Sequence, residues 1–140
     1  EAPAWGFKDP RTLLTFDFWR EAVPAARLVG TFRHPAQVAR SLNARDPAMT
    51  IERGLELWRA YNERLLALHA RSPFALLDFD AGEDEYRAAL AGVARGLGLA
   101  ACADDEFFSR ELRTTGTPAQ VGLPGPVATL YQCLQTAAAA

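Results

Sequence analysis

Residues 26–45 hold the feature that most constrains the fold, a short apolar run followed by a helix that opens on proline. Residues 27–32 have the length and the β-branched content of a buried strand. Pro35 suits the first position of a helix, because its fixed φ fits the helix and its missing N–H would have no partner there. We therefore expect a strand, a sharp turn and a helix that ends near Asn43.

The same reasoning divides most of the remaining chain into strands and helices. Asp9 followed by Pro10 is a helix-start signal, and the apolar density of the residues after it predicts a buried helix. Strands are expected at residues 4–8, 27–32 and 74–77, and helices at 12–22, 35–43, 51–70, 83–97 and 127–134. This alternation predicts an α/β fold with a parallel sheet flanked by helices.

The domain organisation is simple. A chain of 140 residues is the size of one domain and can bury a real core. Residues 114–126 are rich in glycine and proline and are predicted to form a loop, and residues 136–140 are an alanine tail of low information. The chain opens without methionine in what reads as mid-domain, so we expect one partial domain over residues 1–140.

Composition excludes several classes of function. The net charge of -2 and the pI near 5.7 give no basic field for nucleic acid. Cys102 and Cys133 lie far apart, without a CxxC motif, so we expect two reduced thiols rather than a disulfide or a metal site. We see neither a membrane-spanning run nor an export signal, which predicts a cytoplasmic protein, although a truncated start would have lost such a signal.

A candidate anion site lies where the strand of residues 27–32 meets its helix. Arg33 sits at the strand end, and Ser41 lies roughly two helical turns after Pro35. A guanidinium, a helix N-terminus and a hydroxyl can converge on one phosphate. Arg45 follows Ser41 by four residues and shares its helix face. Taken singly, Arg33 could equally be a surface arginine, and Arg45 a solvated cation at the helix C-terminus.

Two motifs resemble a known family. Arg33-x-Pro35 followed by Ser41 resembles the 3′-phosphate-binding element of sulfotransferases that use 3′-phosphoadenosine 5′-phosphosulfate (PAPS). Residues 8–11, KDPR, resemble the Lys-Asp-Pro segment of tyrosylprotein sulfotransferases and many bacterial sulfotransferases. The resemblance runs over about residues 5–99. It implies a P-loop nucleotide-kinase-like fold, of which this chain would be the C-terminal two-thirds.

The resemblance also implies roles for single residues. Arg33 and Ser41 would bind the 3′-phosphate, and Lys8, the only lysine, would stabilise the departing bridging oxygen or the sulfuryl group. The donor would be PAPS, the product adenosine 3′,5′-bisphosphate, and no metal would be required. Asp9 is expected to act mainly as a helix cap. His34 stands where the family more often has Asp or Asn, and its side chain is a weaker cap.

Four further residues are weaker candidates. Arg113 could fold over the nucleotide, because related enzymes use a late basic loop. Arg11 either pairs with a carboxylate or lines the acceptor side. Trp58 and Tyr61 lie three apart on the helix of residues 51–70, where they either contact adenine or the acceptor, or belong to the core.

The sequence also lacks parts that the family uses, and this leaves alternatives open. No glycine-rich phosphosulfate loop precedes Lys8, and no catalytic base is evident, so we expect this chain alone to be inactive. The acceptor could be a carbohydrate, a peptide or a small phenol. The rival interpretations are a fragment of a P-loop kinase or nucleotide hydrolase, and a non-catalytic interaction domain that covers an exposed sheet edge by forming a homodimer.

Overall fold

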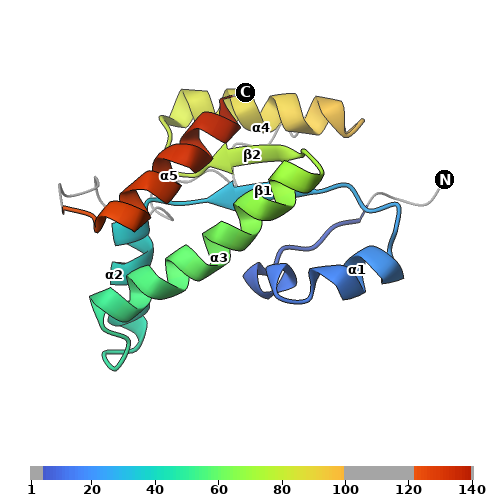
Figure 1. The fold of residues 1–140 in the computed structure, drawn as a ribbon. Helices are drawn as coiled ribbons and strands as arrows, with labels where there is room; N and C mark the ends of the chain where they lie inside the picture. The colour runs from blue at the N-terminus through green and yellow to red at the C-terminus, as the bar shows by residue number, and fades with distance from the viewer. Residues whose placement is uncertain (1–4, 100–121, 140) are drawn as a thin grey trace.

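The computed structural model describes residues 5–99 and 122–139, which form a mixed α/β arrangement (Figure 1). Within these residues five α-helices, one 3-10 helix and two strands follow one another. In chain order they are η1 (Pro10–Leu13), α1 (Phe16–Ala22), β1 (Val29–Phe32), α2 (Pro35–Arg45), α3 (Ile51–Arg71), β2 (Ala75–Asp78), α4 (Glu83–Gly96) and α5 (Gly125–Ala138).

The two strands form a parallel pair, as the sequence predicted. Val29 lies opposite Ala75, and Phe32 lies opposite Asp78. The backbone N–H of Phe79 donates to the carbonyl of Phe32 at 2.9 Å, so the pairing continues one step beyond the strands. Helices α2 and α3 make the crossover between the strands, and α4 and α5 both contact β2. Both strands therefore end at the same edge of the sheet.

The core lies between β1, β2, α3 and α5. Leu134 of α5 is fully buried, and Trp58 of α3 is 3% exposed. The other members of this cluster are Phe32, Ala39, Leu55, Leu65, Leu76, Val127 and Leu130. Helices α2 and α3 approach so closely that a Cβ on Gly54 would lie 2.8 Å from the Cα of Ala39. Glycine at position 54 is what permits this contact.

Local signals fixed several element boundaries correctly. Pro35 begins α2. The Asp9 side chain accepts a hydrogen bond from the N–H of Arg11 at 2.8 Å and caps η1, and the Thr50 hydroxyl accepts from the N–H of Arg53 at 3.3 Å and caps α3. Gly98 follows α4 with a φ of 70°, a conformation that favours glycine.

The N-terminal expectations were wrong in two respects. Residues 5–8 form no strand, and the expected buried helix of residues 12–22 is divided into η1 and α1, in which no residue is buried. Helices of four and seven residues present little surface, so they cannot enclose the side chains that they carry. Phe18 is consequently 63% exposed.

The C-terminal helix is longer than expected. Helix α5 takes in Gly125 and Pro126 from the predicted loop and residues 136–138 from the predicted alanine tail. Proline is favoured in the first turn of a helix and alanine throughout it, which explains both extensions. Residues 114–121 of the predicted loop lie outside the described residues.

Candidate functional site

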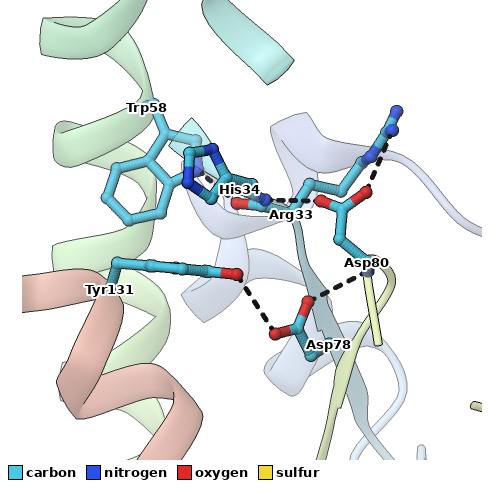
Figure 2. A network of polar contacts seen from close by, with 6 residues as sticks. All are labelled: Arg33, His34, Trp58, Asp78, Asp80 and Tyr131. Atoms are coloured by element: carbon cyan, nitrogen blue, oxygen red, sulfur yellow. Dashed lines mark hydrogen bonds and ion pairs between the residues drawn. The ribbon is translucent and has the colours of Figure 1, made fainter. Parts of the chain in front are cut away.

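The candidate site lies at the carboxyl edge of the sheet, where the chain leaves both strands (Figure 2). Arg33 and His34 follow β1, Asp78 ends β2, and Asp80 comes two residues later. Ligands of open α/β sheets bind preferentially at this edge. Because the two strands are parallel and paired in register, the turn after β1, which carries Arg33, lies beside the turn after β2, which carries Asp80.

Asp80 joins these two turns. One carboxylate oxygen accepts from the backbone N–H of His34 at 2.6 Å, and the other lies 3.3 Å from the Nη2 of Arg33. The Arg33 guanidinium also lies over the ring of Phe79, 4.7 Å from its centroid. The side chains of Arg33 and Asp80 are 31% and 14% exposed. Arg33 is therefore a partly buried cation whose charge is shared with a carboxylate and a ring.

Trp58 of α3 holds the same turn through a hydrogen bond. Its indole Nε1 donates to the carbonyl of Arg33 at 2.9 Å, while the ring is almost wholly buried. This hydrogen bond satisfies a buried donor and holds the turn against α3. The structure thus places Trp58 in the core, which was one of the two roles that the sequence left open.

Asp78 fastens α5 to the end of β2. Its Oδ2 accepts from the hydroxyl of Tyr131 and from the Nε2 of Gln135, both at 3.3 Å. Its Oδ1 accepts from the N–H of Asp80 at 3.0 Å. Burial, and next the negative charge of Asp78, raise the pKa of Tyr131, so the phenol stays protonated and donates a hydrogen bond to the carboxylate. These hydrogen bonds therefore hold α5 against the end of β2.

His34 completes the network. Its ring meets that of Tyr131 edge to face, with the centroids 5.1 Å apart. Burial lowers the pKa of His34, which favours the neutral imidazole near pH 7. Within the described residues its Nδ1 is buried and accepts no hydrogen bond, and the side chain does not cap α2.

Ser41 and Arg45 are brought together on α2, as their spacing predicted. The Nη2 of Arg45 donates to the Ser41 hydroxyl at 3.0 Å, and its Nε donates to the Ser41 carbonyl at 3.2 Å. Gln37, which is 4% exposed, precedes Ser41 by one turn on the same side of the helix. Polar residues at four-residue spacing, Gln37, Ser41 and Arg45, therefore follow one side of α2 from its first turn.

Lys8, Arg11 and Tyr61 belong to a second region. Lys8 is exposed and precedes η1, which packs against α3. Arg11 forks onto the carboxylate of Asp9 with N···O distances of 2.6–3.1 Å, so it pairs with a carboxylate, one of its two expected roles. This pairing lowers the pKa of Asp9 to about 2. The hydrogen bond to Asp9 is the main cause that raises the pKa of Arg11, and Tyr61 adds a smaller contribution.

Four of the predicted site residues form described side-chain pairs: Arg33 with Asp80, Ser41 with Arg45, and Arg11 with Asp9. The binding of one PAPS molecule by Lys8, Arg33 and Ser41 stays a prediction. Arg113 and Cys102 lie outside the described residues, and Cys133 is exposed.

Sequence reasoning missed Asp78, Asp80 and Tyr131 as site residues. A signal for the aspartates was available, because a predicted parallel pair brings the residues after both strands to one edge. Tyr131 carried no such signal, since it lies on a helix about fifty residues later and only the tertiary packing brings it to Asp78.

Comparisons with protein-family models, with curated proteins and with solved structures found no match to this chain. In the described part of the chain, no group of three or more His, Cys, Asp or Glu side chains is arranged to hold a metal ion. None of the helices described is both long and apolar enough to cross a bilayer.

Proposed function

We propose that this chain supplies the 3′-phosphate-binding element of a PAPS-dependent sulfotransferase with a P-loop nucleotide-kinase-like fold. The observation that carries the proposal is the position of Arg33. Arg33 follows the last residue of β1 at the carboxyl edge of a parallel sheet. The helix that comes next opens on Pro35 and carries Ser41. This arrangement and the motif resemblance rest on the same residues, and together they support the proposal.

The chemistry of these groups suits a phosphate. A guanidinium can fork onto two phosphate oxygens, a serine hydroxyl adds a short hydrogen bond, and the N-terminus of α2 favours negative charge. Asp80 already shares the Arg33 charge, so an incoming phosphate competes with a carboxylate at 3.3 Å. Arg45, hydrogen-bonded to Ser41, is a second cation that offsets this competition.

The proposed reaction transfers a sulfuryl group. The bond between sulfur and the bridging oxygen of PAPS breaks, and a bond forms between sulfur and a hydroxyl oxygen of the acceptor, whose proton passes to a general base. Adenosine 3′,5′-bisphosphate is the leaving group. An ammonium near the bridging oxygen would offset the negative charge that develops there, and Lys8 is the residue proposed for that role.

Calorimetric titration of the chain with adenosine 3′,5′-bisphosphate tests the proposal. Arg33→Ala and Ser41→Ala should each weaken binding, Arg33→Ala by about 10- to 100-fold because it removes a charged hydrogen-bond donor. Arg64→Ala, which removes an exposed arginine from α3, is the matched control and should bind like the parent. Unchanged affinity in both site variants would refute the assignment.

The same titration, repeated with ATP and Mg²⁺, distinguishes the sulfotransferase from the kinase interpretation. A P-loop kinase or nucleotide hydrolase binds ATP in a Mg²⁺-dependent manner. A chain that binds ATP with Mg²⁺ but shows no preference for a 3′-phosphate would favour that rival over the sulfotransferase.

A second candidate is an interaction domain, and the exposed N-terminal aromatic residues favour it. Trp5, Phe7 and Phe18 are 71%, 53% and 63% exposed, and large exposed apolar groups often mark binding surfaces. This candidate predicts a stable homodimer by size-exclusion chromatography with light scattering, in which Phe18→Arg restores the monomer. A monomeric parent chain would contradict it.

A further inference from the structure

A hollow of about 370 Å³ lies between η1 and α1. It is lined by Phe7, Asp9, Arg11, Thr12, Thr15 and Trp19. It is an open surface hollow rather than an enclosed cavity. Small-molecule sites combine an apolar wall with a few polar groups. The lining of this hollow has both parts.

The apolar wall is aromatic. The rings of Phe7 and Trp19 lie 4.7 Å apart between centroids at an interplanar angle of 44°, and Trp5 stacks on Phe7 at 6.3 Å. Phe7 is 53% exposed, so part of its ring faces solvent. The negative face of an aromatic ring attracts weakly positive C–H groups as well as cations.

The polar groups form a rim of donors and acceptors. Arg11 donates from its Nε and Nη2 to the Asp9 carboxylate, and this pairing lowers the pKa of Asp9 to about 2. Thr15 stands at the N-cap of α1 but makes no capping hydrogen bond with its side chain. Its hydroxyl can therefore donate to and accept from a ligand.

We infer that this hollow binds a pyranose ring and that the acceptor is a carbohydrate. The inference deepens the proposed function and rests on it. A pyranose presents an apolar C–H face, which suits the wall of Phe7 and Trp19, and adjacent hydroxyl groups, which suit an ionic pair and a threonine. A simple phenol has one hydroxyl and would leave most of the rim unused. Lys8, the residue proposed to stabilise the sulfuryl group, directly precedes Asp9 of the rim in the chain.

Saturation-transfer NMR with lactose, cellobiose and maltose, and with 4-nitrophenol as the phenolic comparison, tests this inference. At least one disaccharide should receive saturation from the parent chain. Trp19→Ala should abolish that signal, and Thr15→Val should reduce it several-fold. Thr31→Val, which removes an exposed threonine hydroxyl from β1, is the matched control and should leave the signal unchanged.

Several outcomes would overturn the inference: no disaccharide signal with the parent chain, equal signals in the parent and both variants, or saturation of 4-nitrophenol alone. Circular dichroism shows whether Trp19→Ala is folded, and Thr15→Val retains the test if it is not. The two proposals fail separately. Nucleotide binding without disaccharide binding would remove only the carbohydrate, whereas disaccharide binding without nucleotide binding would refute the sulfotransferase and leave a sugar site.

Discussion

The N-terminal region, residues 5–26, and the core around β1, α3 and α5 are both rich in large apolar side chains, yet only the core buries them. Leu134 and Trp58 are buried in the core, whereas Phe18 and Leu14 are 63% and 48% exposed. The difference lies in their partners. Core residues face a paired strand or a long helix, while η1 and α1 are too short to cover one another.

Truncating matched leucines gives the largest expected contrast between the two regions. Leu134→Ala should lower the free energy of unfolding by about 2–5 kcal/mol, because it leaves a cavity in a fully buried cluster. Leu14→Ala should lower it by less than about 1 kcal/mol. Urea unfolding followed by circular dichroism measures both, and equal losses would show that the N-terminal region is packed as tightly as the core.

Truncating matched aspartates gives the next contrast. Asp80→Ala should cost about 1–3 kcal/mol, because it leaves the buried turn without the acceptor of the His34 N–H. Asp17→Ala, an exposed change in α1, should alter the free energy of unfolding by no more than about 0.5 kcal/mol. The same unfolding experiment compares them, and an Asp80→Ala variant as stable as the parent would contradict the network at the strand ends.

A pair of glycines tests the close packing inside the core. Gly54→Ala should destabilise the chain by about 1–3 kcal/mol, since the new Cβ would lie 2.8 Å from the Cα of Ala39. Gly92 of α4 has only the end of the Arg95 side chain near it, at 3.9 Å. Gly92→Ala should therefore stabilise by about 0.5–1 kcal/mol through helix propensity alone. Opposite signs in thermal unfolding support the α2–α3 contact, and two stabilising changes would contradict it.

The smallest expected effect concerns pH. Burial lowers the pKa of His34 in the folded state below its ordinary value near 6.5. The unfolded chain therefore binds a proton first as the pH falls, so the stabilising contribution is present above pH 6.5 and is lost toward the lower folded pKa. His34→Gln should flatten this part of the stability profile between pH 7.5 and 5, measured by urea unfolding. His69→Gln serves as the control, and an unchanged slope in His34→Gln would remove His34 as the cause.

The fold and the site were predictable to different degrees. Local signals such as Pro35 and the apolar run of β1 identified most elements, because they act within a few residues. The predictions that failed, a strand at residues 5–8 and a buried helix at residues 12–22, depended on whether distant parts of the chain pair with the strand or cover the helix. The same distinction holds in the site, where the spacing of Ser41 and Arg45 predicted their contact, but the link from Asp78 to Tyr131 depends on tertiary packing.

The central claim is that Arg33 binds the 3′-phosphate of a nucleotide. Calorimetry of the parent chain and Arg33→Ala with adenosine 3′,5′-bisphosphate and with adenosine 5′-phosphate isolates that one group. The parent should bind the bisphosphate more tightly, by roughly 10-fold or more, and Arg33→Ala should lose most of this preference while its affinity for the 5′-phosphate changes little. An equal preference in both proteins, or none in the parent, would contradict the claim.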